Sequence, residues 1–146
     1  MNVDVVTEIV IERPVDVVAA YAADPSNAPE WYANIESVEW RTEARLERGA
    51  KIAFVARFLA RRLEYTYELV EVEPGALLVM RTAEGPFPME TTYTFAPVAG
   101  TCTRMTLRNR GEPGGFSRLL APLMAPAMRR ANGKDLAKLK AILEAG

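Results

Sequence analysis

Hydrophobic and polar residues alternate with a period of two along most of the chain, which is typical of half-buried β-strands. The alternation is clearest over residues 62–69, and it also marks residues 5–12 and 51–58. Shorter or less regular segments of the same kind bring the number of predicted strands to seven. These segments lie at about residues 38–41, 76–83, 89–95 and 103–110.

A tight connection at residues 59–60 would join two of these strands into a hairpin. It would set Phe54 opposite Tyr65 and Ile52 opposite Tyr67. Both pairs then place apolar side chains on one face, which a shift of a single residue would destroy. The sequence therefore predicts an antiparallel sheet with one apolar and one polar face.

Helical patterns occur on both sides of the main run of strands. Two short helices are predicted after the first strand, one starting at Pro14, whose fixed φ suits a first helical turn, and one over about residues 25–32. The last predicted element is an amphipathic helix of roughly thirty residues. In this helix, Pro122 and Pro126 predict a kink or a broken first section. Its apolar stripe is interrupted at Asn132 and consists of Leu120, Met124, Met128, Leu136, Leu139 and Leu143.

This order of elements predicts how they pack. A long amphipathic helix that follows antiparallel strands covers one face of their sheet, because neither surface can otherwise bury its apolar residues. If the sheet curves, the space between the two layers can hold a ligand. A ligand-holding chamber is therefore the leading functional hypothesis.

Several stretches of the chain are similar to a known family. They are residues 11–21 (IERPVDVVAAY), the Glu30-Trp31 corner, residues 84–87 (EGPF) and residues 134–140, which hold KDL and LK. These stretches resemble the START-like (Bet v 1-like) superfamily, and within it the bacterial polyketide cyclase/dehydrase-type, or SRPBCC, proteins. Members of the superfamily include lipid carriers, hormone receptors and aromatic cyclases, so the fold alone does not select a function.

The resemblance implies an α+β helix-grip fold in a single domain over residues 1–146. In this fold a seven-stranded, curved antiparallel sheet wraps around a long C-terminal helix. Two short helices follow the first strand, and an apolar cavity lies inside. These features are expectations that the structure can test.

Composition narrows the functional classes further. The 18 basic and 19 acidic side chains nearly balance and are interspersed, so the chain lacks the basic patch of a nucleic-acid or anionic-membrane binder. No stretch approaches the ~20 apolar residues of a membrane span. We therefore expect a soluble, cytoplasmic protein whose partner is a small hydrophobic ligand. The pattern does not indicate an oligomeric state.

The residue types also restrict the possible chemistry. The chain has no histidine, which excludes Ser-His-Asp and Cys-His triads and most zinc and iron sites. The lone Cys102 lies on the polar side of its predicted strand, where an inert thiol is expected. No phosphate-binding loop or dinucleotide motif is present. We therefore expect no metal and no cofactor, and any catalysis would depend on Tyr, Arg, Glu, Asp or water.

Strand alternation nominates the residues that would line a cavity. Tyr65, Tyr67 and Tyr93 share the predicted inner face, where a ligand could supply the partner that a buried phenol needs. The alternative is that they pack in the core with their hydroxyls reaching backbone or solvent. Asn109 could orient a polar group of the ligand or serve the adjoining loop. The other candidates, which core packing explains as well, are Trp31, Trp40, Phe54, Met89, Thr91, Met105, Met124 and Met128.

The role of Arg81 depends on the orientation of the strand over residues 76–83, which is apolar on both faces. In one register Arg81 points inward beside Thr91, where its guanidinium could bind a carboxylate or enolate of a ligand. In the other register Leu78 and Met80 point inward and Arg81 lies in water. The sequence leaves both registers open.

Two main functional classes follow from these patterns. The first is binding or carrying of a small hydrophobic molecule, such as a lipid, isoprenoid, polyketide or aromatic metabolite. The second is a cyclase or dehydratase in which Arg81 or Tyr93 would stabilise an enolate. A protein-interaction module is a weaker alternative, which a solid core would favour. The lack of a histidine and of a recognisable acid/base pair favours binding.

Overall fold

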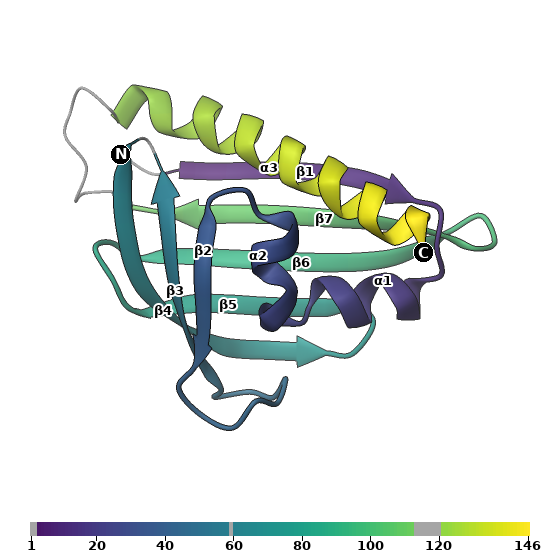
Figure 1. The fold of residues 1–146 in the computed structure, drawn as a ribbon, viewed down its shortest axis with the longest axis horizontal. Coiled ribbons are helices and arrows are strands. Elements are labelled where there is room, and N and C mark those ends of the chain that lie inside the picture. Colours follow the sequence, from purple (N-terminus) through teal and green to yellow (C-terminus); the bar gives the residue numbers. More distant parts are fainter. Residues whose placement is uncertain (1–2, 59, 113–120) are drawn as a thin grey trace.

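The computed structural model describes residues 3–58, 60–112 and 121–146, and the elements follow the predicted order (Figure 1). Within these residues the helical segments are α1 (Val15–Ala22), the 3-10 turn η1 (Pro25–Asn27), α2 (Ala28–Trp31) and α3 (Ala121–Ala145). The strands are β1 (Val3–Ile11), β2 (Ile35–Trp40), β3 (Lys51–Phe58), β4 (Arg61–Glu73), β5 (Leu77–Glu84), β6 (Met89–Val98) and β7 (Cys102–Gly111).

The strands form one antiparallel sheet in the order β1-β7-β6-β5-β4-β3-β2. Strand β4 bends along its 13 residues, so that β2 and β3 run across the direction of β5, β6 and β7 (Figure 1). The pairing of β4 with β5 shifts register between Thr66 and Tyr67 and again between Leu69 and Glu71. Such bulges bend and twist a strand. The sheet therefore curls around its inner face, as the helix-grip fold requires.

The predicted hairpin register is confirmed. Ile52 pairs with Tyr67 and Phe54 pairs with Tyr65 across β3 and β4. The alternation of apolar and polar side chains excludes a shift by one residue, which would turn one apolar row outward, and the short connection between Phe58 and Arg61 selects among the registers that remain.

Helix α3 lies against the inner face of the sheet and runs alongside β1 (Figure 1). Its residues Leu136 and Leu139 are 1% and 0% exposed and share a buried cluster with Leu69 of β4. Met124 and Met128 belong to a second buried cluster that includes the first residues of β1. The helix thus buries its apolar stripe against the sheet, as predicted.

Within the described residues α3 is continuous from Ala121 to Ala145 with Pro126 inside it, so the helix is not broken at Pro126, and a kink there stays a prediction. Pro126 and Pro122 are both exposed, so water can satisfy the carbonyl that Pro126 leaves without a helical partner. Residues 113–120, which include Leu120 at the start of the predicted stripe, lie outside the described residues. None of the helices in the described part of the chain combines the length and hydrophobicity that a bilayer crossing requires.

The C-terminal end of α3 is fastened to the end of β1. The Glu12 backbone N–H donates to the Glu144 carboxylate at 2.8 Å, and Arg13 Nη2 donates to the Glu144 and Gly146 carbonyls at 2.8 and 2.9 Å. Lys140 Nζ donates to the backbone carbonyl at the end of β1, 2.9 Å away, and to the Glu144 carboxylate. These hydrogen bonds anchor the last two turns of the helix.

Candidate functional site

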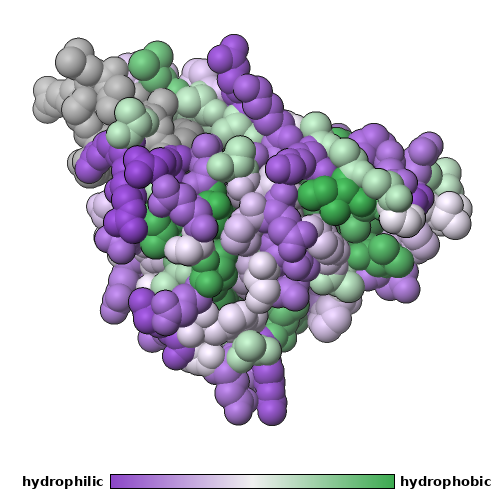
Figure 2. Space-filling view, in the orientation of Figure 1, coloured by the Kyte–Doolittle hydropathy of each residue, from purple (hydrophilic) through white to green (hydrophobic). Residues whose placement is uncertain are grey.

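A cavity of about 140 Å³ lies between the curved sheet and the middle of α3. An engineered protein cavity of about 150 Å³ binds benzene. The present cavity therefore has room for about one aromatic ring. Figure 2 shows hydrophilic side chains over much of the surface in its view, with hydrophobic side chains in separate patches.

Aromatic side chains from the β3–β4 hairpin form one wall of the cavity. The Phe54 ring stacks on the Tyr65 ring with centroids 5.4 Å apart, and it meets the Tyr67 ring edge-on at 5.6 Å. The rings of Tyr65 and Tyr67 are 5.1 Å apart. Stacked and edge-on contacts of this kind are favourable. They hold the wall in one arrangement before a ligand enters.

A chain of hydrogen bonds links β4, β6 and β7 at the cavity surface. The Tyr67 hydroxyl lies 2.9 Å from Thr91 Oγ1, and Thr91 Oγ1 donates to Asn109 Oδ1 at 2.8 Å. A threonine hydroxyl has one proton, which Thr91 uses in its hydrogen bond to Asn109 Oδ1. Thr91 can therefore only accept a hydrogen bond from Tyr67, so Tyr67 is the donor. Burial raises the pKa of Tyr67 to about 12, so the phenol is neutral. Its oxygen can still accept a hydrogen bond from a ligand.

A second pair of phenols, Tyr32 and Tyr93, lies at the other side of the cavity with 2.7 Å between the hydroxyl oxygens. Burial is the main cause that raises the pKa of both phenols well above the usual value. Two neutral phenols that share one hydrogen bond retain one further proton to donate. The hydroxyl of Tyr65 has no hydrogen-bond partner among the described residues. The cavity wall therefore has phenolic hydroxyl groups that can still donate a hydrogen bond to a ligand.

Helix α3 contributes two polar side chains that are one turn apart. Asp135 is 3% exposed, and its Oδ1 accepts the Ala33 backbone N–H at 3.0 Å. Burial raises the pKa of Asp135 from 3.8 to about 6, although the Ala33 N–H and the charge of Lys138 act in the opposite direction. Asn132 is 5% exposed, and its Nδ2 has no hydrogen-bond partner among the described residues. Both side chains line the cavity.

A wider groove of about 690 Å³ lies on the outer side of the same part of α3. Asn34, Ala131 and Asp135 line both the groove and the cavity, so these residues separate the cavity from the surface. The exposed side chains of Arg130 and Lys134 flank the groove. The groove and the cavity are thus adjacent to each other.

The structure brings together most of the predicted cavity residues. Those in the lining are Phe54, Tyr65, Tyr67, Met89, Thr91, Tyr93, Asn109 and Met128. Contact with a ligand stays a prediction for each of them, as does a catalytic role for Tyr93. Four other candidates are core or packing residues outside the lining: Trp31, Met105 and Met124 are fully buried, and Trp40 is half-buried with its indole N–H donating to Ser26 Oγ.

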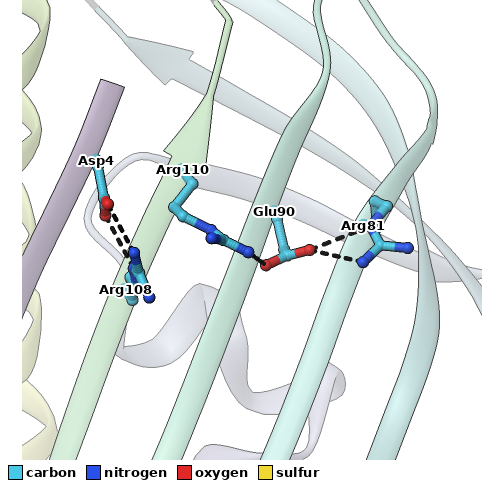
Figure 3. A network of polar contacts seen from close by, with 5 residues as sticks. All are labelled: Asp4, Arg81, Glu90, Arg108 and Arg110. Carbon is cyan, nitrogen blue, oxygen red and sulfur yellow. Dashed lines mark hydrogen bonds and ion pairs between the residues drawn. The ribbon is translucent and has the colours of Figure 1, made fainter. Parts of the chain in front are cut away.

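The inward orientation considered for Arg81 is wrong. Met80 pairs with Thr91 and Arg81 pairs with Glu90, so the register is the one that points Met80 inward. The Arg81 guanidinium donates to Glu90 Oε2 at 2.8 and 3.1 Å on the outer face, where Arg110 reaches the other carboxylate oxygen (Figure 3). The side chain of Arg81 is 60% exposed. It can bind no ligand in the cavity and is removed from the catalytic candidates.

The register of the β5–β6 hairpin depends on a side chain that the alternation does not reveal. Thr82 Oγ1 accepts the Met89 backbone N–H and donates to the Met89 carbonyl, both at 2.9 Å. This double hydrogen bond closes the hairpin one residue away from the register that would turn Arg81 inward. An apolar strand without alternation gave no means to detect the difference.

Several lining residues were missed. Tyr32 follows a short helix rather than a strand, so alternation gave no orientation for it. Asn132 and Asp135 were not nominated, although a polar residue that interrupts an apolar stripe is a visible signal of a buried polar site. That interruption at Asn132 could have identified the α3 side of the cavity.

The curved antiparallel sheet with a long C-terminal helix against its inner face defines a helix-grip α+β fold. The family model described as "Polyketide cyclase / dehydrase and lipid transport" matches residues 2–144. The chain therefore belongs to this family. No match was found among curated proteins.

Solved structures with the same fold cover nearly the whole chain. Protein TTHA0849 from Thermus thermophilus has a TM-score of 0.81 and 24% identity, with 97% of each chain covered. The Zhui aromatase/cyclase from Streptomyces sp. R1128 has a TM-score of 0.83 and 14% identity, covering 99% of this chain and 94% of that one. A START superfamily protein from Mycobacterium smegmatis has a TM-score of 0.83 and 10% identity, with 97% of each covered. Identities this low support the fold and not a shared activity.

Proposed function

We propose that the protein binds a small, largely apolar molecule, about the size of one aromatic ring, in the cavity between the sheet and α3. The observation that carries this proposal is a cavity of about 140 Å³ with aromatic walls and a few polar groups that are not fully used by the protein itself. Ligand sites typically combine apolar walls with a few polar groups that fix orientation. Membership in a family described by cyclase, dehydrase and lipid-transport functions supports the same class of ligand.

The cavity itself can be tested by filling it. Ala56 of β3 is 7% exposed and lines the cavity, so Ala56→Leu places three more carbon atoms in it. Ala53 lies on the same strand but points to the opposite face, which makes Ala53→Leu the matched control. We expect ethylbenzene to bind the wild-type protein and the control, and to bind Ala56→Leu at least about tenfold more weakly.

Ligand binding is followed by a two-dimensional NMR titration, which also shows whether each variant is folded. If ethylbenzene and acetophenone both fail to shift the resonances of cavity residues in the wild-type protein, the proposal is wrong. Equal binding to the two alanine variants would place the ligand outside this cavity and would also contradict the proposal.

A cyclase or dehydratase is the second candidate function. The observation that favours it is Asp135, a cavity carboxyl whose pKa of about 6 suits proton transfer near neutral pH, in the same cavity as the phenol of Tyr93. The cavity volume of about 140 Å³ favours a short substrate, because the space between the sheet and α3 holds about one ring. With Arg81 excluded, such an enzyme would rest on these two residues.

This second candidate can be tested separately from binding. Asp135→Asn and Tyr93→Phe keep the shape of each side chain and remove its acidic proton or its hydroxyl. If the protein is an enzyme, turnover of a short reactive β-diketone should fall by about a hundredfold in at least one of them. Unchanged turnover in both variants would exclude this mechanism.

A further inference from the structure

Asn132 is a buried polar residue that the packing of the core does not explain. It interrupts the apolar stripe of α3, is 5% exposed, and lines the cavity with an Nδ2 group that has no partner among the described residues. A buried donor without a partner is costly, and an apolar side chain of the same shape would avoid that cost. The position therefore points to a ligand that completes the missing hydrogen bond.

The type of bond that is missing follows from the chemistry of the groups around the cavity. An amide NH2 can only donate, so the ligand atom opposite Asn132 must be an acceptor. The unpartnered hydroxyl of Tyr65 and the spare proton of the Tyr32–Tyr93 pair are also able to donate. Each of these donors could bind an oxygen atom of a ligand.

The charges near the cavity determine which oxygen is suitable. Asp135 lies one turn after Asn132 and lines the same cavity, and only its Oδ1 atom has a hydrogen-bond partner among the described residues. The guanidinium that reaches the cavity rim, from Arg57, is 63% exposed and forms an ion pair with Glu36 at 2.7 Å. Within the described lining, no free basic group is therefore available to neutralise an anionic ligand beside Asp135. A carboxylate would be repelled there, whereas a neutral carbonyl would not.

We propose that Asn132 is a specificity-determining residue that donates a hydrogen bond to the carbonyl oxygen of a neutral aromatic ketone or aldehyde, and that the site selects such ligands over arene carboxylates. This inference rests on the proposed function, since it names the ligand class of the same cavity. Asn132 is a binding residue here and needs no catalytic role.

The test compares two neutral probes of nearly equal shape, acetophenone and ethylbenzene, which differ in one carbonyl group. In Asn132→Leu, the affinity for acetophenone relative to ethylbenzene should fall by about tenfold compared with the wild-type protein, because the carbonyl oxygen then has no donor. Arg129→Leu is the matched control, since Arg129 is exposed on the same helix and lines neither the cavity nor the groove. This control should leave the ratio of affinities unchanged.

A second measurement uses only the wild-type protein, so it still tests the inference if Asn132→Leu does not fold. In the wild-type protein, the side-chain NH2 resonances of Asn132 should shift on addition of acetophenone and should shift much less with ethylbenzene. Benzoate at about pH 8 should bind at least tenfold more weakly than acetophenone, because both benzoate and Asp135 are then ionised.

The outcomes separate the two proposals. If both neutral probes bind but the ratio of their affinities is unchanged in Asn132→Leu, the inference is overturned and the proposed function remains. The same holds if the Asn132 NH2 resonances of the wild-type protein do not shift when acetophenone binds. Benzoate that binds as tightly as acetophenone would overturn the selection against carboxylates. If neither neutral probe binds, the proposed function itself is wrong.

Discussion

Replacing Asp135 by asparagine should raise the stability of the protein at neutral pH and remove a pH dependence. Burial raises the pKa of Asp135 to about 6 in the folded protein, against 3.8 for the exposed group. The folded state therefore binds the proton more tightly than the unfolded state. As a result, the free energy of unfolding of the wild-type protein falls as pH rises from about 4 to about 6, and stays lower above that range.

The size of this effect follows from the shift in pKa. A change from 3.8 to about 6 corresponds to at most about 3 kcal/mol. Asp135 also lines the outer groove, where water can approach the carboxylate and reduce the penalty. We therefore expect Asp135→Asn to gain about 1 to 2 kcal/mol relative to wild type between about pH 4 and pH 7. The asparagine Oδ1 can still accept the Ala33 N–H, so this hydrogen bond is not the source of the difference.

Urea denaturation followed by circular dichroism over about pH 2.5 to 8 measures the effect directly. Glu144→Gln provides a contrast of opposite sign, because hydrogen bonds from the Glu12 N–H and Lys140 lower the pKa of Glu144. The stabilisation from Glu144 is present above the unfolded pKa of 4.5 and disappears as pH falls through the lower folded value. If the free energies of unfolding of wild type and Asp135→Asn change with pH in the same way over this whole pH range, the burial argument for Asp135 is wrong.

Three further substitutions test separate parts of the structure by the same denaturation assay. Gly111→Ala should destabilise by about 2 kcal/mol or more, because the added Cβ would lie 2.5 Å from the Pro88 carbonyl oxygen, a backbone atom that cannot turn aside as the Met89 side chain can; a neutral result would contradict this close approach. Tyr67→Phe should cost about 1 kcal/mol through loss of the hydrogen bond to Thr91, and an unchanged midpoint would show that this bond contributes nothing. Glu90→Gln should destabilise by about 1 kcal/mol at low salt and by less at high salt, since it leaves two arginines without their anion; a loss that does not depend on salt would refute the ionic explanation.

The sequence predicted the fold where its alternation was regular. The β3–β4 hairpin carries apolar side chains at every second position and has a short connection, which together select one register, and Phe54 lies opposite Tyr65 as expected. Strand β5 is apolar on both faces, so the position of Arg81 depended on hydrogen bonds made by Thr82, which the hydrophobic pattern does not contain.

The candidate site was predicted less completely than the fold. Its sheet side follows from strand alternation, and for that reason residues such as Tyr93 and Asn109 were found. Its helix side comes from polar residues whose burial depends on how closely α3 approaches the α2–β2 corner. That distance is a property of packing in three dimensions, so the buried position of Asp135 beside Ala33 could not be obtained from the sequence alone.

The two ends of α3 are attached to the rest of the protein in different ways. The last two turns are held to the end of β1 through Glu144 and Lys140, whereas among the described residues a single hydrogen bond, from Ala33 to Asp135, connects the segment 121–139 to the rest of the chain. The rest of the attachment of this segment is apolar packing, with Met124 and Met128 buried beside the start of β1 and Leu136 and Leu139 in the main buried cluster. Hydrophobic contacts have no fixed direction, so a small rearrangement that admits a guest molecule would cost few hydrogen bonds while the far end of the helix stays fastened.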